Sequence, residues 1–239
     1  MEHHSNLVPW HLVAKKTGAR LRYLELDEEG RLILDPLPEI LGGGRVRIAA
    51  VAHVSNALGT INPVAEIARQ VHDAGALLLV DGAQGAPHHP LDVRALGADF
   101  LAFSGHKMCG PTGIGVLWAR EDLLEAMPPY QGGGEMIDQV ERDYSTWAAL
   151  PHKFEAGTPN IAGAVGIGAA VQYLKTFDPD AILAHEQDLA AYANEQLAES
   201  PGVRLFGPRD PRARAGVVSF RMAEAHPHDI STVLDREGI

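Results

Sequence analysis

Three short apolar runs, each ending in polar residues, constrain the fold of this chain more than any other feature of its sequence. The runs are residues 47–52, 77–80 and 98–103. Their length and continuity predict strands that are buried on both faces of a parallel sheet. An amphipathic stretch at 63–74, with Asn62 as its expected cap and Gly75 as its stop, predicts a helix between the first two strands. This order predicts an α/β fold with a mostly parallel central sheet flanked by helices.

Two further segments extend this pattern. Residues 90–96 predict a short helix, and residues 113–118 predict another strand. That strand follows the run at 98–103 too closely for a helical crossover, so we expect it to lie antiparallel to its predecessor. Residues 132–134 and 154–160 are expected to be loops, since glycine, proline and asparagine dominate them.

The C-terminal third has a different pattern. The expected elements are helices at 162–177 and 179–199, strands at 203–206 and 217–221, and a helix at 228–236 that stops at Gly238. We therefore predict a large domain over residues 1–176 and part of a smaller α+β domain over residues 177–239. A Gly-Ile pair after a helix normally leads into another strand, so we expect this chain to be a fragment of a longer protein.

Composition excludes several classes of protein. The 239 residues include 20 Lys plus Arg and 31 Asp plus Glu, a formal net charge of 20 − 31 = −11. This acidic balance argues against nucleic-acid binding. No apolar run is long enough for a membrane span, and the start Met1-Glu2-His3-His4 lacks the features of a signal peptide. One Cys excludes a disulfide framework, and the adjacent His88 and His89 cannot easily share a metal ion. We expect a soluble cytoplasmic enzyme without a metal.

Polar residues follow all three predicted parallel strands. They are Asn56 after the first strand, Asp81 and Gln84 after the second, and Ser104, His106 and Lys107 after the third. In parallel α/β sheets, ligands bind at the carboxyl ends of the strands. One pocket could therefore collect all six side chains. The chain has no G-x-G-x-x-G motif and no P-loop, so a nucleotide site of either kind is not indicated.

Lys107 and Asp81 carry the strongest chemical signal. The four other lysines, Lys15, Lys16, Lys153 and Lys175, lie in settings where solvation is expected. Lys107 follows an apolar strand, where a partly desolvated amine could attack a carbonyl. Asp81 ends an apolar run, where a carboxylate is costly unless it is paired. A protonated heterocyclic nitrogen would pair with it, and the ring nitrogen of pyridoxal phosphate needs an acidic partner of this kind.

Several motifs in this order resemble the class V aminotransferase group of pyridoxal-phosphate enzymes, of fold type I, and more narrowly its SUF-type cysteine desulfurases. The motifs are Glu2-His3-His4-Ser5-Asn6, His53-Val54-Ser55-Asn56, Val80-Asp81-Gly82-Ala83-Gln84, Ser104-Gly105-His106-Lys107, Gly110-Pro111-Thr112-Gly113, Gly132-Gly133-Gly134-Glu135 and Glu155-Ala156-Gly157-Thr158-Pro159-Asn160. The resemblance covers nearly the whole chain. Ser-Gly-His-Lys alone is moderately specific, whereas all the motifs in order are strongly specific.

The resemblance assigns roles toward pyridoxal 5′-phosphate. Lys107 would bind the cofactor covalently and later move the Cα proton of the substrate, and His3 would stack on the ring. Asp81 would hold the pyridine nitrogen and Gln84 the phenolate oxygen. The remaining assignments are Ser104 and His106 on the phosphate, Asn56 near the ring or substrate, and Thr158 on the cofactor phosphate of the partner subunit in a homodimer.

The resemblance implies an intact protein that converts L-cysteine to L-alanine and passes persulfide sulfur to an acceptor protein of the SUF system for iron–sulfur cluster assembly. The family's nucleophilic Cys and its carboxylate-binding Arg lie farther downstream, and a phosphate-binding segment lies upstream. We interpret Cys109, the only Cys, as a packing residue and expect weak or no activity from these 239 residues.

Other functions stay open at this point. Within the same group, the protein could be a selenocysteine lyase or another class V enzyme. From a different class, it could be a non-catalytic remnant that only binds pyridoxal phosphate or dimerises. A nicotinamide dehydrogenase is a weaker alternative because the glycine-rich fingerprint is missing.

Overall fold

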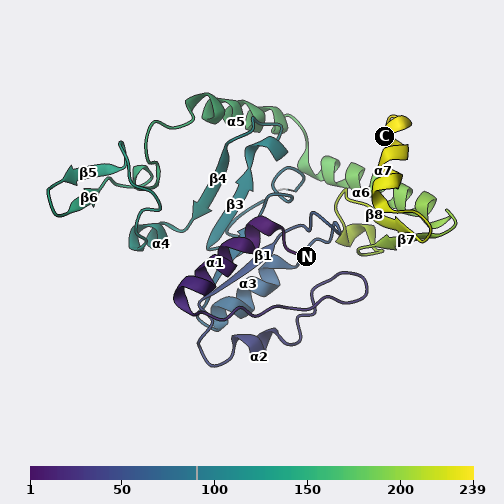
Figure 1. Cartoon of the computed structure of the whole chain (residues 1–239), viewed down its shortest axis with the longest axis horizontal. Coiled ribbons are helices and arrows are strands. Elements are labelled where there is room, and N and C mark those ends of the chain that lie inside the picture. Colours follow the sequence, from purple (N-terminus) through teal and green to yellow (C-terminus); the bar gives the residue numbers. More distant parts are fainter. Residues whose placement is uncertain (90) are drawn as a thin grey trace.

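A four-stranded sheet forms the centre of the molecule in the computed structural model, which describes residues 1–89 and 91–239. The strands are β1 (Ile48–Ala52), β2 (Leu77–Asp81), β3 (Phe100–Ser104) and β4 (Gly115–Ala119), in the order β1-β2-β3-β4 (Figure 1). The first three are parallel, and β4 is antiparallel to β3. The predicted fold class and the direction of β4 are therefore confirmed.

Helix α3 (Val64–Asp73) covers one face of this sheet, as its apolar spacing predicts. Val64, Ile67, Ala68 and Val71 are buried against Leu78 and Val80 of β2. The predicted cap of α3 is wrong. Asn62 instead donates through Nδ2 to the carbonyl of Ala52 at 2.8 Å, so it ties the loop back to β1, and α3 begins without a side-chain cap.

The N-terminal segment forms a 3₁₀ turn, η1 (His4–Asn6), followed by α1 (Val8–Thr17). A short helix, α2 (Leu37–Leu41), contributes Leu37 and Leu41 to the core under α3. The sequence patterns did not predict these three elements, because each is short or lacks a strong apolar period. Together they bring the start of the chain onto the sheet (Figure 1).

The predicted helix at 90–96 is wrong for the residues that can be described. Pro90 lies outside the described residues, and the chain forms a turn at 93–97 in place of a helix. Asp92 accepts hydrogen bonds through Oδ1 from the backbone amides of Arg94 at 2.8 Å and Ala95 at 3.2 Å. Asp92 thus caps a single turn, in which Leu96 N donates to Asp92 O at 2.9 Å, and the turn ends at Gly97, whose φ is 68°.

Beyond β4, a hairpin projects away from the sheet. Helix α4 (Glu121–Ala126) leads to β5 (Ile137–Val140) and β6 (Ser145–Trp147), followed by the turn η3 (His152–Phe154) and helix α5 (Ile161–Leu174) (Figure 1). The expected solvation of Lys153 is wrong. Its side chain is buried, and Nζ donates to the carbonyls of Leu124 and Glu125 at 2.9 Å each, at the end of α4.

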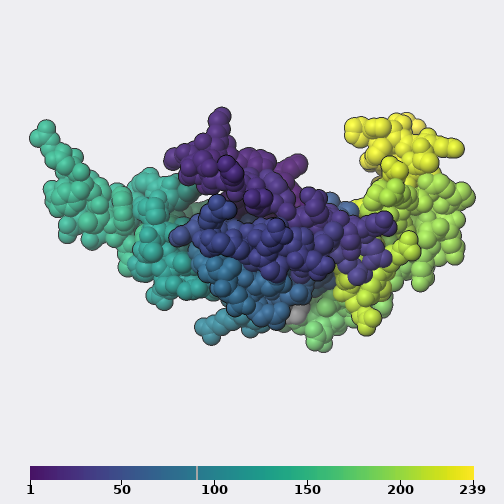
Figure 2. All heavy atoms as spheres, turned by 90° about the horizontal axis from the view of Figure 1, so that it is seen from below, coloured from purple at the N-terminus to yellow at the C-terminus, as the bar shows by residue number. Residues whose placement is uncertain are grey.

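The C-terminal elements form a separate α+β layer at one end of the elongated molecule (Figure 2). They are α6 (Pro179–Ala198), β7 (Val203–Phe206), the turn η4 (Pro211–Ala213), β8 (Ser219–Met222) and α7 (Pro227–Arg236), with β7 and β8 antiparallel. The layer docks on the loop after β1, because Ile61 donates to Ala213 at 3.0 Å and Ala215 to Gly59 at 2.9 Å.

Asp99 ties the amino edge of the sheet together, at the end opposite to the candidate site. Its carboxylate is 1% exposed and accepts from Leu78 N at 2.8 Å, His72 Nε2 at 2.8 Å and Arg120 Nη1 at 2.9 Å. Burial alone would raise the pKa of Asp99, but these hydrogen bonds outweigh it and lower the pKa below its usual value. Asp99 therefore fastens β2, β3, α3 and the end of β4 in one network.

Among the described residues, no helix combines the length and the apolar character that crossing a membrane would require.

Candidate functional site

The carboxyl ends of β1, β2 and β3 lie side by side and are joined through the backbone. Asp81 pairs with Ala52 of β1 and with Ala102 of β3. Beyond the strands, His53 N donates to Asp81 O at 2.9 Å, and Gly82 N donates to Ala102 O at 2.8 Å. The sheet therefore brings the residues that follow the three strands to one edge, as predicted.

Asp81 lies in the middle of this edge, and its side chain is half-buried. Its Oδ1 accepts a hydrogen bond from Ala83 N at 2.9 Å, which orients the carboxylate across the turn after β2. In the part of the chain that the structure describes, no basic side chain forms an ion pair with it. The carboxylate thus keeps its capacity to accept a further, positively charged donor.

Lys107 ends the 3₁₀ turn η2 (Gly105–Lys107), which starts directly after β3. The turn sits tightly under α5, because a Cβ on Gly105 would lie 2.7 Å from Ile167 Cδ1 and 3.0 Å from Ile114 O. Lys107 is half-buried, and among the described residues no hydrogen bond or ion pair to its amine is found. The turn therefore presents an uncommitted amine close to the strand ends.

Ser104 and His106 flank this amine. Ser104 is the last residue of β3, pairs with Gly115 of β4 and is half-buried, whereas His106 is exposed. A hydroxyl and an imidazole within three residues of Lys107 offer hydrogen-bond donors to an anion at this turn.

His3 and Asn56 reach the same region from the β1 side. The turn η1 packs against β1, and His3 caps it, because His3 Nδ1 accepts from Ser5 N at 3.2 Å. The His3 ring is otherwise exposed, as is the Asn56 side chain in the turn after β1. The His3 ring lies near the ring of His4, with centroids 5.6 Å apart, and the His3 and Asn56 side chains are both accessible to a ligand.

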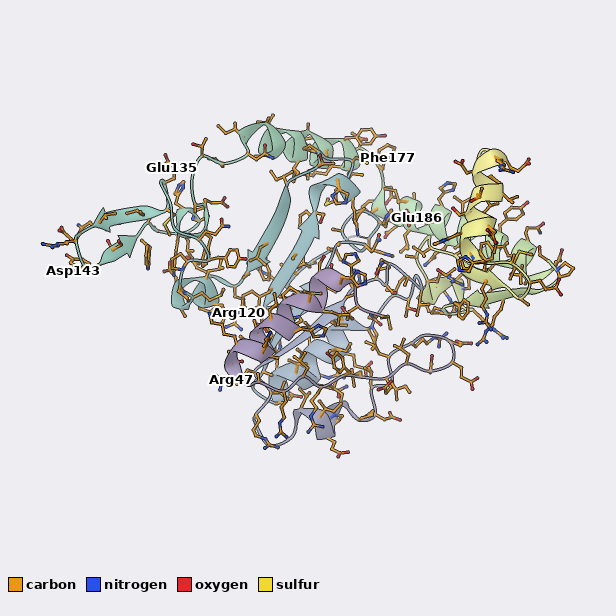
Figure 3. All side chains as sticks on the ribbon, viewed as in Figure 1. Arg47, Arg120, Glu135, Asp143, Phe177 and Glu186 are labelled. Atoms are coloured by element: carbon orange, nitrogen blue, oxygen red, sulfur yellow. The ribbon has the colours of Figure 1, made fainter. Side chains whose placement is uncertain are left out.

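Gln84 is half-buried and lines a cavity of about 310 Å³ that extends from the site toward α6. Two other residues that line this cavity contact each other, because His88 Nδ1 lies 2.5 Å from Glu186 Oε1. Figure 3 shows Glu186 on α6, at the side of the C-terminal layer that is nearer to the sheet. The pair is therefore a polar link between the loop that follows β2 and helix α6.

His53 is a buried residue that lies in one of the motifs named above but was assigned no role from the sequence. Burial, with a smaller contribution from His89, lowers the pKa of His53 to about 4, so its imidazole is neutral at neutral pH. The ring meets His89 edge-on, with centroids 5.5 Å apart. Among the described residues its Nδ1 has no hydrogen-bond partner, and a Cβ on Gly85 would lie 2.1 Å from it. Only a glycine at position 85 leaves room for this imidazole.

Two candidate residues lie apart from the cluster. Thr158 is exposed in the loop before α5, and Asn160 anchors that loop to Gly113 O at 3.4 Å. No recorded contact brings Thr158 to the other candidates within the described chain. The interpretation of Cys109 as a packing residue is wrong, because its side chain is exposed; its φ of 57° lies in the left-handed region.

The donor set at this edge fits pyridoxal phosphate. A carboxylate without a cationic partner, Asp81, suits a protonated ring nitrogen, and an amine without a partner, Lys107, suits an aldehyde. Ser104 and His106 supply donors for a phosphate, and His3 supplies a flat ring for stacking. Within the described residues, no group of three or more His, Cys, Asp or Glu side chains is arranged to hold a metal ion.

Comparison with known proteins gives a consistent result. The family description "Aminotransferase class-V" matches residues 1–239. The chain is 53% identical over its whole length to a probable cysteine desulfurase of Streptomyces coelicolor and 48% identical to a cysteine desulfurase of Haloferax volcanii. It spans 57% and 56% of the length of these two relatives.

Solved structures agree with the sequence relatives. A cysteine desulfurase from Escherichia coli superposes on the whole chain with a TM-score of 0.94 at 44% identity, and the chain covers 58% of it. A mutant of the enzyme C-DES, with glycine covalently linked to its pyridoxal phosphate, superposes with a TM-score of 0.87 at 25% identity, and the chain covers 64% of it.

Proposed function

The chain belongs to the class V aminotransferase family, and on this premise we propose that it is the cofactor-binding portion of a pyridoxal-phosphate-dependent cysteine desulfurase. The relatives of this name match the entire chain, but the chain spans just over half of their length. The proposed activity therefore belongs to a longer protein of which residues 1–239 are a part.

One observation carries this proposal. Asp81 and Lys107 follow neighbouring parallel strands, are both half-buried, and have no partner of opposite charge among the described residues. A half-buried charge without a partner costs stability. A ligand that carries both a basic ring nitrogen and an aldehyde would pair with Asp81 through the nitrogen and react with Lys107 through the aldehyde. When bound, pyridoxal phosphate supplies an electron sink for a carbanion at the substrate Cα.

The side chains around the ring would bind and orient it. The Asp81 carboxylate would keep the ring nitrogen protonated, since an opposite charge at hydrogen-bond distance favours the charged form. Gln84 would donate its amide to the phenolate oxygen. The other proposed contacts are Ser104 and His106 to the phosphate, His3 to the ring face, and Asn56 to the ring or substrate.

Lys107 would have two functions. Its amine would bind the cofactor aldehyde until a substrate amine displaces it. The released amine would then take the proton from the substrate Cα and return a proton during turnover, as a general base and acid. The absence of a competing partner in the described chain supports both functions, because the amine is free to move.

For the longer protein, we propose conversion of L-cysteine to L-alanine with transfer of the sulfur to a protein thiol as a persulfide, then to a SUF-type acceptor for iron–sulfur cluster assembly. We place this reaction in the cytoplasm. The names of the matched relatives, which call them cysteine desulfurases, support L-cysteine as the substrate.

We further propose a homodimer in which Thr158 binds the phosphate of the cofactor in the partner subunit. The exposure of Thr158 supports this role, and so do exposed apolar side chains on the neighbouring helix α5, namely Ile161, Val165 and Tyr173. A domain boundary at 176/177 is supported by the separate sheet of β7 and β8.

Reductive trapping tests the proposal. The 239-residue protein is incubated with pyridoxal phosphate, treated with borohydride, digested, and examined by mass spectrometry. We expect a pyridoxyl group on Lys107 and none at this position in Lys107→Ala. Lys16→Ala is the matched control, since Lys16 is an exposed lysine on α1 and its removal should leave the labelling unchanged.

A folded wild-type protein without the label on Lys107 would contradict the proposal and would favour the remnant that only dimerises. Labelling of several exposed lysines to an equal extent would also contradict it, because a specific site must react in preference to solvent-exposed amines.

A further inference from the structure

We propose that Glu2 is a positioning residue whose carboxyl group holds the turn that carries His3 against the carboxyl end of β1. This inference rests on the function proposed above, because it matters for activity only if His3 faces the cofactor. Glu2 would act through His3, because the Glu2 carboxyl would not itself contact the cofactor ring.

A chain of side-chain hydrogen bonds starts at Glu2. Asn6 Nδ2 donates to Glu2 Oε2 at 2.7 Å, and Trp10 Nε1 donates to Asn6 Oδ1 at 3.1 Å. The three residues are spaced by four, so they line one side of the turn η1 and the start of α1. Asn6 is only 6% exposed. Its amide is thus satisfied inside the protein by an acceptor and a donor that the same segment supplies.

In the sequence, His3 lies between Glu2 and Asn6, the two residues that the first of these hydrogen bonds joins. The backbone amide of Asn6 donates to His3 O at 2.8 Å, while the Asn6 side chain donates to Glu2. The His3 ring is fixed in turn by Ser5, whose backbone amide donates to Nδ1 at 3.2 Å. Asn6 therefore binds the His3 carbonyl through its backbone amide and the preceding residue, Glu2, through its side chain. Glu2 supplies the acceptor for the second of these bonds.

Glu2 also lies close to the candidate site. Burial raises the pKa of Glu2, and the Asp81 carboxylate raises it further. Hydrogen bonds from the Ala52 backbone and the Asn6 side chain act in the opposite direction. The Glu2 carboxyl lies beside the turn η1, where it accepts the hydrogen bond from Asn6. The packing of η1 on β1 agrees with this placement.

The geometry distinguishes a hydrogen-bonding role from a role of charge. An amide oxygen at the same position would accept equally well from Asn6 Nδ2, without the cost of a half-buried negative charge. Truncation to alanine would instead leave the buried Asn6 amide without its acceptor. We therefore expect Glu2→Gln to behave like the wild type and Glu2→Ala to release the turn.

The test combines two measurements on wild type, Glu2→Ala, Glu2→Gln and His3→Ala, with Glu141→Ala as an exposed control on the hairpin. The first is titration with pyridoxal phosphate, followed by visible circular dichroism. We expect Glu2→Ala to weaken binding by about fivefold, equivalent to one lost hydrogen bond, and to lose dichroism as His3→Ala does. Glu2→Gln and Glu141→Ala should stay within about twofold of wild type.

The second measurement is amide hydrogen exchange at residues 5–7 without cofactor. We expect exchange at Asn6 and Leu7 to be at least about tenfold faster in Glu2→Ala than in wild type, Glu2→Gln and Glu141→Ala. If wild type fails to bind pyridoxal phosphate, the proposed function fails. Faster exchange in Glu2→Ala would in that case still support the role of Glu2 in holding the turn. Normal exchange in Glu2→Ala, faster exchange with unchanged dichroism and affinity, or a Glu2→Gln variant as defective as Glu2→Ala would each overturn the inference.

Discussion

The backbone amide of His53 donates to the backbone carbonyl of Asp81 at 2.9 Å, one residue past the end of β1. This bond extends the pairing of β1 and β2 to the point where the chain leaves the sheet. It fixes the backbone of Asp81 on one side, while the pairing with Ala102 fixes it on the other. The candidate acid is therefore held by rigid strands, and a mobile loop is not needed to position it.

The first prediction concerns the charge of Asp81. Asp81→Asn keeps the shape of the side chain but removes the charge that would stabilise a protonated ring nitrogen. We expect pyridoxal phosphate to remain attached to Lys107 but to bind about tenfold more weakly, equivalent to about 1.4 kcal/mol. Visible absorption titration measures this change. Asp143→Asn, at the tip of the β5–β6 hairpin (Figure 3), is the control, and equal affinities for the two variants would contradict the role of Asp81.

The second prediction concerns the pH dependence of stability through His53. The pKa of His53 is about 4 in the folded protein, below the ordinary value of 6.5. The unfolded chain therefore takes up the proton first, so stability falls as the pH decreases from 6.5 to 4. The loss from this residue should approach roughly 3 kcal/mol by pH 4.

Urea unfolding of wild type and His53→Leu at a series of pH values between 7.5 and 4 measures this effect. The variant should show a smaller slope of the unfolding free energy against pH, although some slope will remain, because burial also lowers the pKa of His89. Parallel curves for the two proteins would show that His53 is not the group responsible.

The third prediction concerns the Asp99 network at the amino edge of the sheet. Asp99→Asn places an amide where three donors converge, so we expect a loss of about 3 kcal/mol in unfolding free energy at pH 7. Because the folded-state pKa of Asp99 is lowered, its contribution is present above about pH 4 and is lost as the pH falls further.

Denaturant unfolding at pH 7 and at pH 3 measures both parts of this prediction. Asp122→Asn is the matched control, because Asp122 is exposed and binds the same Arg120. The control should lose less than about 1 kcal/mol. A similar loss in both variants would mean that the buried position of Asp99 confers no special stability.

The fourth prediction concerns the space beside His53. Gly85→Ala would put a Cβ 2.1 Å from His53 Nδ1, so the buried ring would have to move. We expect a loss of about 1–3 kcal/mol, typical of an overpacked core. Gly132→Ala is the control, since no atom lies within 4 Å of its added Cβ. Thermal unfolding compares them, and an unaffected Gly85→Ala protein would show that the imidazole can shift freely.

The sheet could be predicted closely from the sequence because its signal is local. Runs of apolar residues bounded by turns mark β1, β2 and β3, and the short connection to β4 requires an antiparallel strand. The hairpin β5–β6 was missed because its strands are short, mostly exposed and polar, so no alternation marks them. The helix predicted after residue 90 is reduced to a single turn, which Asp92 caps and Gly97 ends.

The candidate site was predictable only in part. Asp81 and Lys107 were identified from their places after apolar strands, a relation that the chain order itself contains. Glu2 and His53 were not singled out, and Lys153 and Cys109 were placed wrongly. Nothing adjacent to Glu2 in the sequence marks its burial, which depends on the docking of η1 against β1.

The sequence by itself thus determined the α/β class, the strand directions and which strands end in reactive side chains. These properties follow from the period and length of apolar runs, which neighbouring residues set. Only the tertiary structure decided which polar groups are buried and what they contact. His53 meets Gly85, and Glu186 meets His88, across distances along the chain that no local pattern spans. Burial and hydrogen bonding, and hence the pKa of each group, depend on contacts that exist only once the chain has folded.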